Sequence, residues 1–405
     1  MMMFILAWKN IWRNKKRSLI ILAATAIGLA AGLFSVGLMT GMYDSMVDSA
    51  IKRGLANIQI HTGAYKKDQL ISQFIPHPDS LMRSVRSNSD VAVCASHSII
   101  EGMASSATVA SGASIIAVDP DVERTATAIA QSIKEGTYLD KANTVAVGRK
   151  LAEKLKLHLR SRLVLSFAGL DGNIIYAAFR ISGIYSTDAS TFDGVNVFIR
   201  QDDLAQLLGT DVPIHEIIVR TKNSLQLDQT RNELQAAMPE SVTVETWKEI
   251  SPEMKLTADS SDIVNTIFLG IILFALLFGL TNTLLMSVLD RVRDFGVLLA
   301  VGMFRRRLFS MIILESLFLS FTGGIVGVII GWALTAYFNT HGINLASVSA
   351  GLSSYGIPSM LYPFIKPAMY GTLSLMMIFT SIVAAMYPAI KAIRLRPVEA
   401  IRTIA

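Results

Sequence analysis

The segment DRVRDFGVLLAVGMFRRR, residues 290–307, separates two long runs of apolar residues and decides how the chain is organised. One side of the segment is apolar and consists of Val292, Phe295, Val297, Leu298, Leu299 and Val301. The other side is polar and carries Arg291, Arg293 and Asp294. This pattern predicts a short amphipathic helix capped at its C-terminus by Gly302. Such a helix either lies on a membrane surface or docks into a groove of a partner protein.

Outward from this segment, four apolar stretches are long enough to span a bilayer, which takes about 20 residues. They are residues 18–42, 263–289, 308–338 and 368–389. The chain of 405 residues is 52% hydrophobic and 17% charged, with a mean hydropathy of +0.47. A soluble domain carries about 25% charged residues, so an ordinary cytosolic enzyme is excluded. The single cysteine, Cys94, excludes an internal disulfide and a cysteine-rich metal site.

The charges predict the orientation of the spans. Residues 43–262 hold 22 Lys and Arg against 27 Asp and Glu, whereas the rest of the chain holds 15 against 4. Of those 15 bases only Lys366 lies on the side of the large loop. By the positive-inside rule, residues 1–17, 290–307 and 390–405 are cytoplasmic, and residues 43–262 and 339–367 are outside. The first span is too long for the core of a cleaved signal peptide, so we expect a retained anchor.

The large loop is long enough for one folded domain or two small ones, and its pattern mixes strands and helices. Strands are expected at 58–61, 91–95, 115–118, 144–147, 163–167, 174–183, 196–199, 214–220 and 241–245. Helices are expected at 80–87, 121–133, 149–156, 201–207 and 224–237. Asp171 and Gly172 predict a hairpin turn. The predicted fold class is therefore a membrane protein with four transmembrane α-helices and a large α+β domain inserted between the first and second.

The sequence offers no catalytic or metal site. It contains no GxxxxGK[ST], HExxH or GxSxG pattern, and its six histidines show no paired ligand spacing. We therefore expect no enzyme activity in this chain. Active transport would need energy from a partner or an ion gradient. Asp119, Asp193 and Asp203 are expected to cap turns. Glu315 is the one acid within a span and has no evident partner base, so we expect it to hydrogen-bond neighbouring helices rather than to relay protons.

Small residues recur at four-residue spacing in the first and third spans, which predicts close helix packing. They are Gly28, Gly32, Gly37, Gly41, Gly323, Gly327 and Gly331. This packing is either within one subunit or between two subunits.

Three segments resemble the FtsX-type permeases of ABC transporters. They are DRVRDFGVLLAVG at 290–302, AWKNIWRNKKRS at 7–18 and YPAIKAIRLRPVEAIR at 387–402. The resemblance implies that the first is a coupling helix that docks onto an ABC ATPase, and that residues 1–17 form an amphipathic helix leading into the first span. The docking residues it implies are Asp290, Arg293, Asp294, Phe295, Gly296, Val297, Leu298 and Gly302. We expect a charge at Phe295 or Gly296 to prevent docking and leave the protein folded.

Four segments of the large loop resemble the lipoprotein-releasing permeases of the LolC/LolE type. They are IIAVDPDVE at 115–123, VAVGRKLAEKLKL at 145–157, ISGIYSTDASTFDGVNVFI at 181–199 and TWKEISPEM at 246–254. The resemblance implies a type VII ABC permease with a MacB-like periplasmic domain in the bacterial inner membrane. Its implied partners are two LolD-like ATPase subunits, which bind ATP and Mg²⁺, a second permease in a homo- or heterodimer, an acylated lipoprotein, a LolA-like periplasmic carrier and membrane lipid. No cofactor in this chain and no nucleic acid are expected.

In this interpretation ATP-driven motion passes through the helices to the outer domain and expels the lipoprotein, a mechanotransmission. The acyl chains would enter a cavity between the first two spans, lined by bulky apolar residues. The candidates are Phe34, Met39, Met42, Met46, Phe268 and Ile272. Two alternatives remain: a MacB-like efflux or extrusion permease, and an FtsX-like regulator of a cell-wall hydrolase.

Overall fold

The chain divides into two compact units. The computed structural model describes residues 15–223 and 226–394. The helical unit comprises residues up to 42, 259–343 and from 361 onward, and the α/β unit comprises 43–258 and 344–360. The fold class predicted from the sequence, four membrane helices with a large α/β domain between the first and second, is confirmed. The predicted helix at 1–17 and the C-terminal motif lie wholly or partly outside the described residues.

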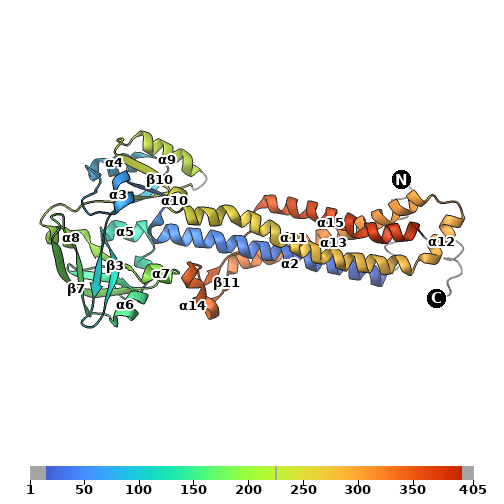
Figure 1. The fold of residues 1–405 in the computed structure, drawn as a ribbon, viewed down its shortest axis with the longest axis horizontal. Helices are drawn as coiled ribbons and strands as arrows, with labels where there is room; N and C mark the ends of the chain where they lie inside the picture. Colours follow the sequence, from blue (N-terminus) through green and yellow to red (C-terminus); the bar gives the residue numbers. More distant parts are fainter. Residues whose placement is uncertain (1–14, 224–225, 395–405) are drawn as a thin grey trace. The chain divides into compact units, whose positions relative to one another are not determined.

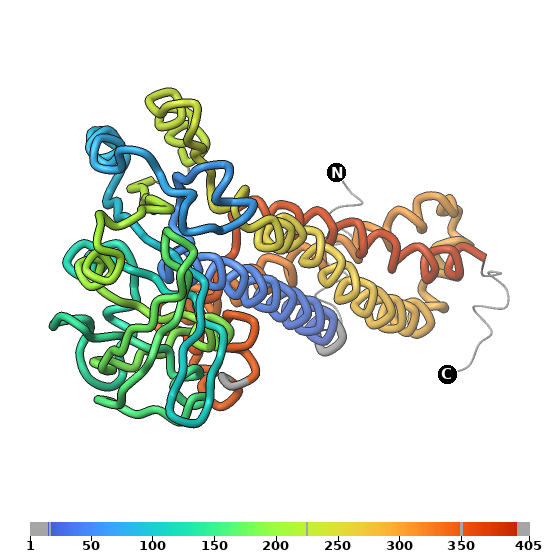
Figure 2. The backbone as a smooth tube through the Cα atoms, turned by 60° about the vertical axis from the view of Figure 1, so that its left-hand side comes forward, coloured from blue at the N-terminus to red at the C-terminus, as the bar shows by residue number. Residues whose placement is uncertain are grey.

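The helical unit is built from long helices that run alongside one another (Figures 1 and 2). They are α2 (Lys15–Ala50), α11 (Pro252–Leu289), α13 (Arg305–His341) and α15 (Pro367–Ile393), with the short α12 (Val292–Ala300) between α11 and α13. The first four are long and apolar enough to cross a membrane, so the chain is a multi-pass membrane protein. Each contains one of the four predicted spans.

The α/β unit is a ten-stranded sheet covered by short helices (Figure 1). The strand order is β10-β1-β9-β2-β3-β8-β5-β7-β4, with β6 paired to β2 and β7. The strands are β1 (Ile58–Thr62), β2 (Val91–Ser105), β3 (Ala110–Val118), β4 (Ile133–Gly136), β5 (Thr144–Gly148), β6 (Arg162–Ala168), β7 (Ile174–Tyr185), β8 (Asn196–Arg200), β9 (Glu216–Thr221) and β10 (Val242–Thr246). The helices are α3 (Gly63–Asp68), α4 (Pro78–Ser87), α5 (Pro120–Ala126), α6 (Arg149–Leu155), α7 (Ser190–Asp193), α8 (Gln201–Leu208), α9 (Leu227–Ala236) and α10 (Trp247–Ile250).

The long strand β2 joins two halves of this sheet. Its first half, Val91–His97, pairs with β9, and its second half, from Ser98, pairs with β3. One apolar core packs under α4 and α9 around Ile60 and Val219, and the other lies around Leu165 and Ile199. The alternation of buried and exposed residues along the strands supplies both cores.

Short elements connect α13 to α15. A strand pair, β11 (Ile343–Asn344) and β12 (Met360–Leu361), encloses the short helix α14 (Ser349–Leu352).

All nine strands predicted in the large loop are strands in the structure, and the Asp171–Gly172 hairpin is confirmed, with Gly172 at φ +80°. The predicted helix at 121–133 is too long, because α5 ends at Ala126 and β4 begins at Ile133. The backbone N–H of Ala128 donates to the carbonyl of Lys52 at 2.7 Å, and this distant contact turns the chain out of the helix. The sequence also missed α3, α7 and α10.

Candidate functional site

The candidate site is centred on α12, the amphipathic helix between the second and third spans. Phe295 is 1% exposed and packs among Val288, Leu308, Met311 and Ala389. On the other side of the helix, Val297 is 47% and Val301 83% exposed. The helix therefore has one face fixed to the bundle and one apolar face left uncovered by the described residues.

This burial corrects one expectation. Phe295 and Gly296 are both buried, so a charge at either position would break the packing of α12 and could not leave the protein folded. Among the other predicted docking residues, Asp290, Arg293, Asp294 and Val297 are exposed, and Leu298 is half-buried. The face available to a partner is thus the one that carries Arg293, Val297 and Val301.

The C-terminal end of α12 is a Schellman cap, as predicted at Gly302. Gly302 has φ +98°, and its N–H donates to the Leu299 carbonyl at 3.1 Å. The N–H of Met303 donates to the Leu298 carbonyl at 3.0 Å. Glycine adopts this left-handed conformation without strain, so the chain can turn sharply into α13.

An ion pair connects the start of α12 to the third span. Arg291 Nη1 donates to both carboxylate oxygens of Glu315, at 2.9 and 3.0 Å, and the two side chains are only 15% and 12% exposed. The guanidinium also lies over the ring of Phe295, 5.1 Å from its centroid. The expectation that Glu315 has no partner base was therefore wrong. Coulomb attraction between two charges so little exposed to water is stronger than in a surface pair, so the ion pair holds α12 against α13.

The glycines of the third span pack against the first span within one chain. A Cβ at Gly327 would lie 2.8 Å from the Ala26 carbonyl oxygen, and one at Gly331 would lie 2.9 Å from Leu33. Gly323 meets Thr25 in the same way. In α2, Gly28 and Gly32 face residues of α11. Gly37 faces Thr335 of α13 and Ile365, and Gly41 faces Tyr362 and Pro363, in the segment just before α15. These contacts match packing within one subunit, the first of the two alternatives given for the glycines.

The six predicted cavity residues do not gather at one place. Phe34 packs on Phe338 of α13, with ring centroids 5.6 Å apart, and Ile272 lies beside Gly32. Phe268 is exposed, and Met39 and Met42 are half-buried. Met46 belongs to the α/β unit and is also half-buried. The cavity between the first two spans stays a prediction.

The buried His97 of the α/β unit is paired with two carboxylates. His97 is 3% exposed; its Nε2 lies 2.8 Å from Glu123 Oε2 and its Nδ1 3.1 Å from Glu216 Oε1. Burial lowers the pKa of His97, but the two carboxylates raise it by more, so the pKa is raised from 6.5 to about 10. The ring is thus a cation that joins β2 to α5 and β9.

The remaining predicted polar residues also stabilise the fold. His215 accepts from the Ile99 N–H through Nδ1 and donates to the Ile71 carbonyl through Nε2, each at 3.0 Å, and burial lowers its pKa. Asp119 caps α5, and both carboxylate oxygens of Asp203 share the Asn143 N–H in one bifurcated hydrogen bond. No group of side chains arranged to hold a metal occurs in the described ranges.

Comparison with protein families decides the identity. Residues 18–237 match the model for the MacB-like periplasmic core domain, and residues 266–397 match the FtsX-like permease C-terminal model. This chain belongs to the FtsX/MacB-type ABC transporter permeases. Residues 266–397 include α12. The candidate site therefore lies in the part of the chain that matches the permease model.

Curated relatives of this permease are also ABC transporter permeases or contain one. An uncharacterised ABC transporter permease of Methanocaldococcus jannaschii is 26% identical over 55% of this chain and 55% of its own length. The macrolide export ATP-binding/permease protein MacB of Campylobacter jejuni is 23% identical over 98% of this chain and 61% of its own length. The permease YknZ of Bacillus subtilis is 32% identical over 36% of this chain and 33% of its own length. The chain spans less than two thirds of the length of each of these relatives.

Among solved structures, the periplasmic region of MacB from Actinobacillus actinomycetemcomitans matches 52% of this permease and 97% of that chain, at 10% identity and a TM-score of 0.36. The extracellular domain of a YknZ transporter from Gram-positive bacteria matches 47% of this permease and 100% of that chain, at 12% identity and a TM-score of 0.34.

Sequence reasoning missed the Arg291–Glu315 pair. The two residues are 24 positions apart and belong to different helices, so no helical spacing relates them. The available signal was the acid within an apolar span, which requires a partner.

Proposed function

We propose that this permease works with a separate ABC ATPase, and that ATP-driven motion enters the chain through the uncovered face of α12. The observation that carries the proposal is the division of α12 into a face fixed by Phe295 and an exposed apolar face with Val297 and Val301. Exposed apolar side chains on a short helix outside the spans are suited to a groove in a partner. The basic residues beside the spans support a cytoplasmic position for α12 in the inner membrane.

The route of the motion follows from the packing. Phe295 and the Arg291–Glu315 pair join α12 to α13. The glycines of α13 bring that helix into backbone contact with α2. α2 continues into the α/β unit, where Ile51 and Leu55 pack on the sheet core together with Met254 from α11. A displacement of α12 would therefore pass to α13 and α2 within the helical unit, and we propose that it continues along the chain to the α/β domain, the mechanotransmission that the family resemblance implies.

For the cargo we propose acylated lipoproteins that are extracted from the inner membrane and passed to a periplasmic carrier bound for the outer membrane. Removing acyl chains from a bilayer costs about 0.8 kcal/mol per CH₂, which calls for ATP. The four LolC/LolE-like segments of the α/β unit support this proposal by their order and spacing. Their acids have structural roles, as with Asp193, which accepts from Thr187, and Glu249, which caps α10 with Thr246.

A second candidate is export through a MacB-like assembly. It is favoured by the match to the Campylobacter macrolide exporter, which runs along 98% of this chain.

The test pairs two variants that place an acid at an exposed valine. Val301→Asp lies on the uncovered face of α12, and Val195→Asp is the matched control in the α/β unit, where Val195 is also exposed. Purified in mild detergent, Val301→Asp should lose an ATPase subunit that the wild type and the control retain. Retention of the ATPase by Val301→Asp would contradict the docking proposal.

Mass spectrometry of the bound material then separates the cargo classes. Acylated lipoproteins support release, and their accumulation in the inner membrane of depleted cells is the expected phenotype. A periplasmic adaptor without lipoproteins would instead favour export.

A further inference from the structure

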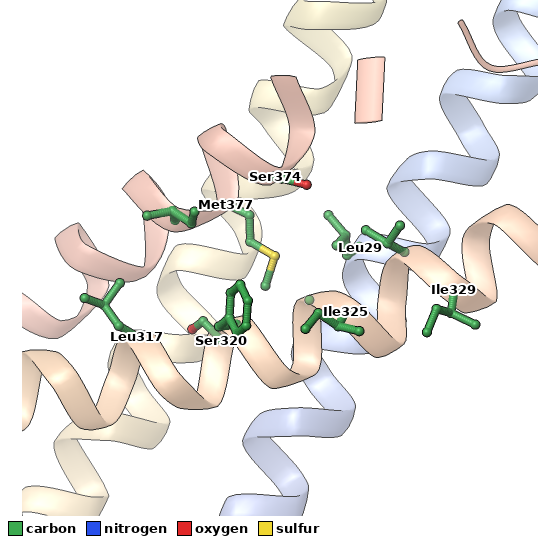
Figure 3. Close-up of a pocket in the computed structure, with 11 residues that line it drawn as sticks. Leu29, Leu317, Ser320, Ile325, Ile329, Ser374 and Met377 are labelled. Atoms are coloured by element: carbon green, nitrogen blue, oxygen red, sulfur yellow. The ribbon is translucent and has the colours of Figure 1, made fainter. Parts of the chain in front are cut away.

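Two hollows in this chain differ in the chemistry of their walls. The first lies between α13, α15 and α2 and is apolar apart from Ser320 and Ser374 (Figure 3). The Oγ of Ser320 has no hydrogen-bond partner among the described residues, but it is buried, so a guest in this hollow would not reach it. The walls of this hollow therefore do not select an occupant.

The second hollow, the charged pocket, lies in the α/β unit and has a volume of about 370 Å³. Pockets for small molecules usually measure about 300–1,000 Å³. β4, α6, α7 and the turn after β7 form one part of the wall, and segment 344–360 forms the rest. The lining residues are Lys134, Arg149, Lys150, Ser186, Thr187, Asp188, Ser190, Asp193, Ala346, Ser353, Ile357 and Ser359.

The cations of the charged pocket are suited to a phosphate. Lys150 is paired with Glu153 at 3.1 Å. Lys134 and Arg149, in contrast, have neither an ion pair nor a side-chain hydrogen bond among the described residues. A guanidinium can donate to two phosphate oxygens at once, and an ammonium can donate to a third. The hydroxyl of Ser186 lines the same pocket and can donate as well.

The two acids of the pocket differ in what they can still accept. Asp193 accepts from the Thr187 N–H at 2.9 Å and from the Thr187 hydroxyl at 2.7 Å, so both of its oxygens are engaged. Asp188 has no hydrogen bond or ion pair among the described residues, although Arg53 attracts it from a distance. The carboxylate of Asp188 is therefore available to a positively charged group of a guest.

These charges together select a guest that carries both signs. A purely anionic guest would leave the carboxylate of Asp188 beside its own charge, and a purely cationic one would face Lys134 and Arg149. A phosphate joined to a primary ammonium group satisfies all three residues. A quaternary ammonium would not, because it has no N–H to donate to Asp188. The chemistry that fits is phosphoethanolamine.

The wall formed by segment 344–360 connects the charged pocket with the bilayer along the chain. The segment follows α13, which ends at His341, and leads to α15, which begins at Pro367. Its ends lie together, because the N–H of Leu345 donates to the Ser359 carbonyl at 2.7 Å. The segment also exposes Tyr355, and tyrosines are enriched where proteins meet the membrane surface. A lipid headgroup is therefore the source of phosphoethanolamine that this wall favours over a soluble molecule.

We propose that the charged pocket binds the headgroup of phosphatidylethanolamine from the leaflet next to the α/β unit. The phosphate bonds to Arg149 and Lys134, the ammonium bonds to Asp188, and the acyl chains remain in the bilayer. The site goes beyond the proposed function and depends neither on the cargo nor on the docking face of α12.

The test measures hydrogen exchange of the full chain in nanodiscs of three compositions. They contain phosphatidylcholine alone, or phosphatidylcholine mixed with phosphatidylethanolamine or with phosphatidylglycerol. Peptides that cover residues 186–193 and 353–359 should exchange more slowly with phosphatidylethanolamine than with either of the other lipids. Soluble glycerophosphoethanolamine is added to phosphatidylcholine discs in a fourth arm. Protection by this compound without protection by phosphatidylethanolamine in the bilayer would overturn the lipid as the source.

Two variants test the two ends of the headgroup. Arg149→Gln should raise the fraction of phosphatidylethanolamine needed for protection about 10-fold, as expected for loss of a hydrogen bond to a charged group. Asp188→Asn should remove the preference for phosphatidylethanolamine over phosphatidylcholine. Arg162→Gln and Asp211→Asn are the matched controls, because both residues are exposed in the α/β unit and neither lines the pocket. Both controls should keep the wild-type preference.

Two results would overturn the site. One is equal protection of these peptides by all three lipids in the wild type. The other is a preference for phosphatidylethanolamine that persists in both Arg149→Gln and Asp188→Asn. Peptides of β3 report on the fold, and their exchange should be the same in all variants.

Discussion

The contact between α13 and α2 predicts a specific penalty for a single methyl group. In Gly327→Ala the new Cβ would lie 2.8 Å from the Ala26 carbonyl oxygen and 3.0 Å from the Leu29 Cβ. Both neighbours sit on or next to the backbone of α2 and cannot rotate away, so the two helices must separate. Overpacking of this kind costs about 1–3 kcal/mol. Alanine also gains about 1 kcal/mol of helix propensity over glycine, which would hide part of the loss.

A matched control removes that complication. Gly279→Ala changes a glycine within α11 that has open space around it, so it has the same propensity gain and no clash. The difference between the two variants is therefore the steric cost alone, about 1–3 kcal/mol. Unfolding of the full chain in mixed micelles, titrated with sodium dodecyl sulfate and followed by tryptophan fluorescence, measures it. Equal midpoints for both variants would refute close packing of α13 on α2.

Three further results are expected. His97→Gln should destabilise the α/β unit by about 3–5 kcal/mol, because it leaves the buried carboxylate of Glu123 and the half-buried carboxylate of Glu216 without their cation; hydrogen exchange of β2 peptides measures this. Since the pKa of His97 is raised from 6.5 to about 10, its stabilising effect is full below pH 6.5 and is lost as pH rises toward 10. The free energy of unfolding of the variant should lack this dependence on pH. Arg291→Ala should destabilise the helical unit by about 3 kcal/mol, and the exchanged pair Arg291→Glu with Glu315→Arg should recover part of it in the same micelle titration; no recovery would argue against a direct pair. Gly172→Ala should cost about 1–2 kcal/mol at the hairpin because of the positive φ, measured by thermal unfolding of the full chain.

Local patterns predicted much of this fold. The four spans follow from uninterrupted apolar runs, the hairpin from Asp171–Gly172, and the end of α12 from Gly302. Each of these depends on residues adjacent in sequence, so the physical cause lies within the pattern itself.

The predictions that failed depend on contacts between residues far apart in the sequence. α5 ends early because Ala128 bonds to Lys52, far away in the chain. Phe295 is buried because α15 supplies Ala389 and Ala392 against it. A nine-residue amphipathic helix shows that one face is apolar, but which apolar residues point inward is decided by the helices that pack there. The unpaired hydroxyl of Ser320 likewise depends on tertiary packing that no periodicity records.

The position of β1 has a consequence for biosynthesis. β1 lies between β9 and β10, and Ile58 pairs with both Val219 and Thr246. A ribosome adding about 5–20 residues per second needs roughly 10–40 s to pass from β1 to β10. β1 has neither neighbour until β9 is made, and one of its edges stays open to pairing with other chains until β10 is made. The α/β unit cannot close until the polypeptide has almost reached α11, so nascent chains of this protein should depend on holding chaperones during this interval.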